Sequence, residues 1–446
     1  MSKLLSIAYR RMVLMLMVVT SAWFGVAGAI AAQPNTEKAE KVLHAWYDLS
    51  LELVRHTATY TPPVASRSLA YLGVTVFEAV ATGSTDMQTL AGQLHGLNAV
   101  PQRKADSTYD DAVVVQATMA FAVQQLFENT GPTGHHAMAA LEAKLRAEVS
   151  KGVPPKVLAR SEAYGRSVAQ HILAWAQDDG GAVVENMGFP MQYDLTKGPA
   201  HWVPTSAIVQ QQKPLLPNWG QNRTFIMPEG TSCALPAPIA YSEDKTSEFY
   251  KQALEVYESK QKLTPEQRAI ARFWSDDAML SLTPPGHWIS IALQITQRDK
   301  VGLEKTVDVM ARLGVAVADA FIGCWQAKYQ YDLVRPITYI RRVIDPKWES
   351  LLNTPPFPEY PSGHSTQSGA AATVLTNVFG ENFAFDDETG KKDGLKPRSF
   401  KSFTEAANDA GISRMYGGIH FRAAIERGLE QGRCIGAFTN ALRTKR

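Results

Sequence analysis

Cysteine is scarce in this sequence, with only Cys233, Cys324 and Cys434 among 446 residues. This number excludes a disulfide framework, and no two of the cysteines stand at the C-x-x-C spacing of zinc or redox sites. At most one disulfide can form within the chain. We interpret Cys324 and Cys434 as small buried side chains on helices.

Neither sign of charge is in excess, because 45 Lys and Arg residues stand against 43 Asp and Glu residues. This balance does not support nucleic acid or an anionic membrane surface as the main partner. An anion-binding site must therefore be local. The alternating pattern of strands is also nearly absent. After the first 31 residues, no apolar run approaches the roughly 18 residues that span a bilayer.

The first 31 residues have the pattern of a signal peptide. Basic residues precede an uncharged stretch that starts at Met12, and Ala29-Ile30-Ala31 supplies a small-x-small cleavage site. We expect export to the periplasm or secretion, with no stable membrane association after cleavage. The stretch is long enough to span a bilayer, so an uncleaved anchor is the alternative.

Apolar residues recur with helical periodicity along most of the remaining chain, which predicts an all-α fold, with two packed helical bundles. In the N-terminal helical region, 32–178, the expected helices are 36–58, 62–83, 106–128, 133–150 and 155–178. Prolines and glycines interrupt 179–245, which we expect to be an irregular connector. In the C-terminal bundle, 246–446, the expected helices are 246–260, 265–282, 286–297, 302–334, 363–379, 400–410 and 418–441.

Two cations mark the end of the helix expected at 302–334. Lys328 lies on the same face as an apolar stripe that ends at Trp325, so a charge is placed on a core-facing surface. Arg335 follows two turns later, and Pro336 marks a helix boundary. Lys328 and Arg335 can therefore converge on one point. The alternative is a snorkelling lysine at a helix end and a surface arginine.

The segment Phe357-Pro-Glu-Tyr-Pro-Ser-Gly-His364 leads into a helix rich in small residues. Ser362 supplies a hydroxyl, Gly363 supplies an unobstructed backbone N–H, and the helix supplies the positive end of its dipole. This combination predicts an oxyanion site. His364, in the first turn, can exchange protons with the bound anion. The alternative is a capped helix with an incidental histidine.

A third segment, Ser413-Arg414, precedes a Gly417-Gly418 break and His420, which is expected to open the last helix. A helix N-terminus favours the neutral histidine, which can bind a metal or attack phosphorus. Arg414 adds a planar fork suited to oxyanions. Glycine then recurs at every fourth position of the last helix. We expect this stripe to allow close helix packing; its members are Gly428, Gly432 and Gly436.

Three of these motifs together resemble the signature of the vanadium-dependent haloperoxidases and of the related acid and lipid phosphatases. The motifs are Lys328-x6-Arg335-Pro336, Pro361-Ser-Gly-His364 and Ser413-Arg414-x5-His420. Two further segments, Phe273-Trp-Ser-Asp-Asp277 and Thr283-Pro-Pro-Gly-His-Trp288, resemble bacterial haloperoxidase-like proteins more loosely. The resemblance implies a fold of helical bundles and vanadate as the prosthetic group.

The same resemblance implies roles for individual residues. His420 would bind the vanadium, and His364 would be the acid–base partner of the apical oxygen. The groups that would hold the vanadate oxygens are Lys328, Arg335, Ser362, the Gly363 amide and Arg414. Lys328 would also polarise bound peroxide. Trp325 and Phe357 would lie on the halide side; the alternative for both is packing in the bundle core.

One position departs from the pattern of many relatives, in which an aspartate follows the metal-binding histidine by four residues. Here that position is Ala424, so a backbone carbonyl or another acid must orient the His420 ring. Asp276 and Asp277 are candidate partners of Arg414. We interpret His287 as a structural turn residue rather than a residue bordering the cleft.

The motifs therefore predict an exported vanadate-dependent haloperoxidase. It would use hydrogen peroxide, a halide and a small organic acceptor, with iodide and bromide favoured over chloride. The main alternative is an exported acid phosphatase, with His420 as the phosphorylated nucleophile and His364 protonating the leaving group. The long region that precedes the motifs favours the haloperoxidase. A non-catalytic protein with a relic site is a third alternative.

Overall fold

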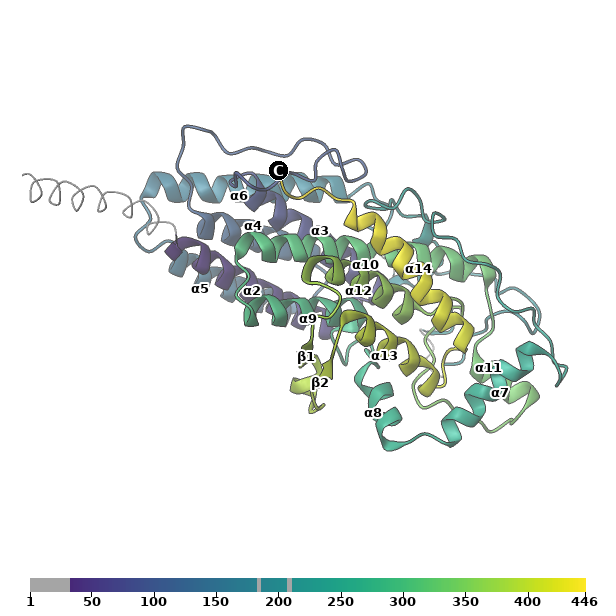
Figure 1. Cartoon of the computed structure of the whole chain (residues 1–446). Coiled ribbons are helices and arrows are strands. Elements are labelled where there is room, and N and C mark those ends of the chain that lie inside the picture. The colour runs from purple at the N-terminus through teal and green to yellow at the C-terminus, as the bar shows by residue number, and fades with distance from the viewer. Residues whose placement is uncertain (1–32, 183–185, 207–210) are drawn as a thin grey trace, which may run out of the picture.

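The computed structural model describes residues 33–182, 186–206 and 211–446, and this part of the chain is predominantly helical (Figure 1). The expected all-α class is confirmed. The expected signal peptide, 1–31, lies outside the described residues.

The N-terminal helices follow the expected pattern closely. They are α2 (Gln33–Arg55), α3 (Pro62–Ala81), α4 (Asp111–Leu126), α5 (Pro132–Val149) and α6 (Pro155–Ala176). Proline stands in the first turn of α3, α5 and α6, where its missing N–H removes no helical hydrogen bond. Helix α4 is capped instead by Asp110, whose side chain accepts a hydrogen bond from the Val113 N–H.

The remaining elements are the 3-10 turns η1 (Asn186–Gly188), η3 (Trp219–Gln221) and η4 (Thr389–Asp393), helices α7 (Glu248–Gln261), α8 (Pro265–Phe273), α9 (Thr283–Arg298), α10 (Leu303–Tyr331), α11 (Pro336–Val343), α12 (Gly363–Phe379), α13 (Phe403–Tyr416) and α14 (Arg422–Asn440), and strands β1 (Phe385–Asp387) and β2 (Arg398–Phe400).

Several expected boundaries in this half were wrong. Helix α8 ends nine residues before the expected 282, because Asp276 and Met279 have positive φ and the chain forms a loop there. Helix α11 and the antiparallel β1–β2 hairpin were not expected, since both are too short to give a clear periodic signal. Helix α13 covers 403–416 rather than 400–410, and α14 begins after His420, which lies in the preceding turn.

Helix α10 is the centre of the molecule, between the N-terminal helices and α12 and α14 (Figure 1). It packs most extensively against α3. A Cβ added at Gly73 of α3 would lie 2.7 Å from the Met310 carbonyl oxygen, so only glycine permits this approach. Helices from both regions share one hydrophobic core. The expected domain boundaries at 178 and 246 stay a prediction.

Helix α3 corrects one expectation about apolar runs. Among the described residues it is the one helix long and apolar enough to cross a membrane, yet 94% of its most apolar window is buried inside the protein. Its composition is thus accounted for by its position against α10.

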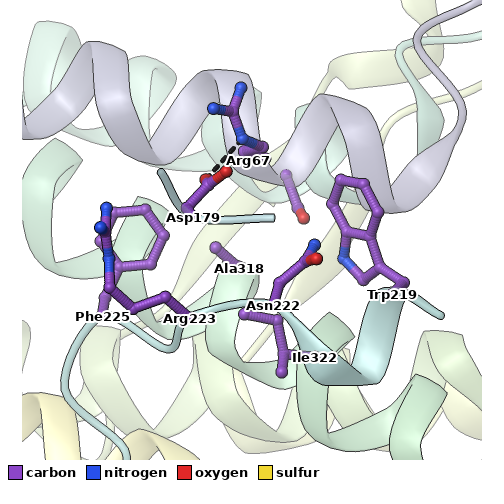
Figure 2. Close-up of a pocket in the computed structure, with 9 residues that line it drawn as sticks. Arg67, Asp179, Trp219, Asn222, Arg223, Phe225, Ala318 and Ile322 are labelled. Atoms are coloured by element: carbon purple, nitrogen blue, oxygen red, sulfur yellow. Dashed lines mark hydrogen bonds and ion pairs between the residues drawn. The ribbon is translucent and has the colours of Figure 1, made fainter. Parts of the chain in front are cut away.

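The connector is fixed to the helical core by buried polar groups. Asp319 of α10 accepts hydrogen bonds from three consecutive backbone N–H groups, those of residues 225–227, at 2.7–3.0 Å. Figure 2 shows the small cleft nearby, where Arg67 of α3 forms a 2.6 Å ion pair with Asp179. Arg67 also donates a hydrogen bond to the Ala176 carbonyl oxygen at the end of α6. The polar groups of this cleft therefore join α3 to α6 and to the connector.

The structure contains one disulfide, between Cys233 of the connector and Cys434 of α14, whereas Cys324 is free and buried. The expectation for Cys324 is confirmed. The interpretation of Cys434 as an unpaired buried residue was wrong, because its partner lies 201 residues away in the sequence and only the tertiary fold brings the two together.

The glycine stripe of α14 does allow close packing, as expected. A Cβ at Gly432 would lie 2.0 Å from the Thr366 carbonyl oxygen and 2.7 Å from the Ala370 nitrogen of α12. Gly428 and Gly436 face α12 in the same way. The stripe therefore brings the start of α14 against the start of α12, where the candidate site residues lie.

We expect Gly432→Ala to lower the free energy of unfolding by about 3 kcal/mol, because the added methyl group overlaps the α12 backbone. In an exposed helix position the same change would instead stabilise by about 1 kcal/mol. Urea denaturation of the full chain measures the difference. Arg433→Ala, on the exposed side of the same helix, is the control. Unchanged stability of Gly432→Ala would contradict this packing.

Candidate oxyanion and metal site

The sequence motifs meet where the ends of five helices converge. Lys328 lies in the last turn of α10, Arg335 caps α11, and His364 lies in the first turn of α12. Arg414 lies in the last turns of α13, and His420 precedes α14. All except His364 are at least 97% buried. The structure thus gathers these separate motifs into one site.

Two arginine–histidine contacts form its centre. Arg335 Nη1 lies 3.0 Å from His420 Nε2, and Arg414 Nη1 lies 2.7 Å from His364 Nε2. A guanidinium has no acceptor, so each imidazole nitrogen must accept and be unprotonated. Both rings are therefore neutral in this arrangement.

Electrostatics favours the same neutral state. Burial, reinforced by Arg414, lowers the pKa of His364 to about 4. Burial and then Arg335 hold the pKa of His420 well below its usual range. Burial lowers the pKa of Arg335 and of Arg414 to about 10, so both remain charged at neutral pH. A neutral imidazole beside fixed cations is suited to bind a metal that carries negative oxygens.

Glu359 orients the His420 ring, a role that sequence reasoning did not assign. Its Oε1 atom lies 2.9 Å from His420 Nδ1 and accepts a second hydrogen bond from the Phe421 N–H, also at 2.9 Å. The Nδ1–H group therefore donates to Glu359, and the lone pair is on Nε2. Burial raises the pKa of Glu359 to about 7, although Arg335 opposes this shift.

The contact with Glu359 explains how the His420 ring is oriented although Ala424 cannot supply a carboxylate. Glu359 stands three residues before Ser362, inside the segment already singled out in the sequence. An acid between two prolines in a buried motif was the available signal. The Ala424 carbonyl has another task, because it accepts a hydrogen bond from the Ser362 N–H at 3.0 Å.

Lys328 is occupied by the backbone of the motif loop. Its ammonium group donates to the carbonyl oxygens of Pro358, Glu359 and Pro361 at 2.9, 3.1 and 2.5 Å. These three bonds use all its N–H donors, and burial lowers its pKa to about 7. In this structure Lys328 holds the loop in place. Its contact with a vanadate oxygen stays a prediction.

Ser362 and Gly363 open α12 as expected. The Ser362 hydroxyl caps the helix by accepting a hydrogen bond from the Ser365 N–H at 3.3 Å. A Cβ at Gly363 would lie 3.7 Å from the Trp325 ring, which is an ordinary van der Waals contact. The cap and the helix dipole both favour an anion here.

The two aromatic candidates pack against each other, with ring centroids 4.9 Å apart. Trp325 is buried, and its indole N–H donates to the Leu215 carbonyl at 3.1 Å. Phe357 is half-buried and lies 5.1 Å from both Lys328 Nζ and the Arg335 guanidinium. Both rings therefore border the site's cations, and their role toward a halide stays a prediction.

The loosely matching segment at 273–277 also reaches the site. Arg414 donates to the Trp274 carbonyl, and the Asp276 carboxylate lies 3.4 Å from His364 Nε2. Asp276 also contacts His287 at 2.9 Å. Both candidate partners of Arg414, Asp276 and Asp277, act on it electrostatically, and the structure places the Asp276 oxygens against the two histidines.

Two donors in this site have no hydrogen-bond partner. Arg335 Nη2 and Arg414 Nε are both buried and unpaired among the described residues. Leaving such charged donors unsatisfied costs about 1–3 kcal/mol or more each. A tetrahedral oxyanion would satisfy both, with the α12 N-terminus as a third donor. The residues present therefore fit vanadate, and by the same chemistry they fit phosphate.

We expect Glu359→Ala to weaken vanadate binding by about 10–100-fold, because the His420 ring loses the acceptor that fixes its tautomer. Glu359→Gln keeps an acceptor oxygen and should cause a smaller loss. Isothermal titration calorimetry with vanadate measures both. Glu349→Ala, at an exposed position in the same region, is the control. Equal affinities of Glu359→Ala and the unmodified protein would contradict the assigned role.

Comparison with known proteins agrees with this geometry. A model of the VCPO second helical-bundle domain matches residues 308–445, the stretch that contains all the candidate site residues from Trp325 to His420. Vanadium chloroperoxidase of Curvularia inaequalis is 27% identical over 222 residues. That match covers 36% of this chain and 36% of the chloroperoxidase, so it spans about a third of the relative's length.

Solved structures resemble most of the chain. A bacterial vanadium-dependent chloroperoxidase in its holo form aligns with a TM-score of 0.68 and 18% identity over 92% of this chain and 95% of its own, a likeness of fold. A bacterial vanadium-dependent iodoperoxidase aligns with a TM-score of 0.83 and 39% identity, over 91% of this chain and 97% of its own. Because this identity extends over nearly all of both chains, the protein belongs to the vanadium-dependent haloperoxidase family.

Proposed function

We propose that the protein is an exported haloperoxidase that binds vanadate and uses hydrogen peroxide to oxidise iodide and bromide in preference to chloride. The observation that carries the proposal is the pair of unpaired arginine donors beside two neutral histidines. The 39% identity to an iodoperoxidase supports the halide preference. Iodide is also the easiest of these halides to oxidise.

The residues that would hold vanadate have distinct tasks. His420 Nε2 would bind the metal, with Glu359 fixing the ring from the other side. Arg335 and Arg414 would hold oxygens through their unpaired N–H groups. The Ser362 hydroxyl and the Gly363 N–H are further proposed donors, and Lys328 would join them by releasing one of its three carbonyl contacts. When bound, vanadate supplies a Lewis acid that activates peroxide.

His364 would accept the proton of the incoming peroxide. Its side chain is 17% exposed, which makes it more accessible than its buried neighbours. Because its pKa lies near 4, the ring is a proton acceptor at neutral pH. The alternative phosphatase needs the same histidine protonated to donate to a leaving group. At neutral pH this site favours the acceptor state, and the peroxidase reaction uses that state.

Reconstitution with vanadate tests the proposal. We expect peroxide-dependent oxidation of iodide and bromide after vanadate is added, and competition from phosphate, which presents similar oxygens to the same donors. His420→Ala should abolish vanadate binding, whereas Lys328→Ala should leave detectable occupancy. Halide oxidation assays and vanadate titrations measure these effects.

The phosphatase would replace the haloperoxidase under a specific outcome. Vanadate would then only inhibit phosphate ester hydrolysis, and no halide would be oxidised at any pH from about 5 to 8, where an unperturbed histidine titrates. Slow phosphatase turnover without vanadate decides nothing, since both hypotheses allow it.

Export is tested separately. We expect mature protein from the exported fraction to begin near Ala32, because the small-x-small pattern ends at Ala31. N-terminal sequencing or intact-mass measurement determines the first residue. Membrane-bound protein that retains Met1 would show an anchor in place of a cleaved signal.

A further inference from the structure

A chain of buried titratable groups extends from His364 away from the vanadate-binding residues. Asp276, in the loop after α8, lies 3.4 Å from His364 and 2.9 Å from His287, which is near the N-terminal end of α9. The other ring nitrogen of His287 lies 2.9 Å from Asp387 of β1. These groups come from four separate elements, so only the tertiary fold aligns them.

His287 is a buried cation in this chain. Each of its ring nitrogens faces a carboxylate, and a carboxylate can only accept, so both nitrogens carry a proton. Burial lowers its pKa, but Asp276 and Asp387 together raise it to about 10. The ring is 2% exposed and stacks on Trp274, with centroids 4.4 Å apart.

Asp387 is itself held in place. The antiparallel β1–β2 pairing sets Asp387 opposite Arg398, and the Thr389 N–H donates to its carboxylate at 2.9 Å. Its side chain is fully buried. The short hairpin therefore delivers a fixed carboxylate to His287.

His364 Nε2 lies between a donor and an acceptor. Arg414 donates to it at 2.7 Å, which requires the neutral ring. The Asp276 oxygen at 3.4 Å would instead attract the protonated ring, yet that oxygen makes no hydrogen bond among the described residues. The position of the Asp276 carboxylate thus decides which state of His364 is favoured.

We propose that His287, held by Asp387, is a positioning residue that keeps the Asp276 carboxylate back from His364. The imidazole then stays directed at Arg414 in its proton-accepting form. The charged and titratable groups that act on His364 are Arg414, Asp276, His287 and His420, and Asp277 acts on Arg414. The inference rests on the proposed function only where it treats His364 as the proton acceptor.

Electrostatics gives the direction of the effect. The His287 cation opposes a second positive charge on His364, and it occupies one oxygen of Asp276. Without that cation, Asp276 is free to pair with a protonated His364. The pKa of His364 should therefore rise when His287 is neutralised.

The test uses His287→Gln and Asp387→Asn in the full chain, with ¹⁵N-labelled histidine followed by NMR in vanadate-free protein. Loss of the His364 signal in His364→Ala assigns the resonance. In His287→Gln we expect His364 to protonate about one pH unit higher than in the unmodified protein. In Asp387→Asn the shift should have the same direction and be smaller, because His287 loses one of the two carboxylates that favour its cationic form but keeps Asp276 as a partner.

Asp319→Asn is the matched control, since Asp319 is a fully buried carboxylate that contacts the connector backbone. It should leave the His364 titration unchanged. In vanadate-loaded protein, the acid limb of the kcat profile for iodide oxidation should move upward in His287→Gln. Vanadate affinity should change by less than about threefold, because the residues proposed to hold the anion are untouched.

An unchanged His364 titration in either foldable variant overturns the proposal, as does an equal shift in Asp319→Asn. If His287→Gln does not fold, Asp387→Asn decides the question alone. If the unmodified protein oxidises no halide, the proposed function fails. The NMR comparison in vanadate-free protein still decides whether His287 positions Asp276.

Discussion

Burial of three cationic side chains at one point is the constraint on which the site depends. Lys328, Arg335 and Arg414 are each no more than 1% exposed and lie within electrostatic range of one another. Removing such charges from water costs several kcal/mol per ion unless hydrogen bonds replace the lost hydration. The surrounding chain must therefore supply acceptors.

Backbone carbonyls provide most of them. Lys328 donates to three carbonyls of the motif loop, and Arg335 donates to those of Phe357 and Ile419. Carbonyl oxygens carry only partial charge, so the excess positive charge remains. A bound oxyanion supplies the full negative charge that the carbonyls lack, and its binding should stabilise the folded chain by mass action. Folding and cofactor binding are thus linked through the same cations.

The sequence was sufficient for the parts of the structure that local patterns encode. Long amphipathic helices appeared within a few residues of their expected limits, and the glycine spacing in α14 indicated its contact. The motif spacings placed Lys328, Arg335 and His364 at helix ends. These predictions succeeded because periodicity, proline positions and helix caps act over only a few residues.

The contacts that were missed depend on tertiary structure. Glu359 reaches His420 across 61 residues, and Asp387 reaches His287 across 100. The disulfide of Cys434 likewise joins distant segments. In one sequence, a buried acid is not distinguishable from a surface acid by spacing alone. The sequence therefore indicated that some group must orient the His420 ring, but it did not identify Glu359 as that group.

Three histidines in this small region differ in charge because their neighbours differ. His364 and His420 lie beside arginines and are neutral, whereas His287 lies between two carboxylates and is protonated. The neutral rings offer lone pairs to a proton or a metal. The protonated ring offers none, and its N–H groups can only hold carboxylates in place. Asp276 contacts one histidine of each kind, His287 and His364. Through this carboxylate, the charge on His287 influences the protonation of His364.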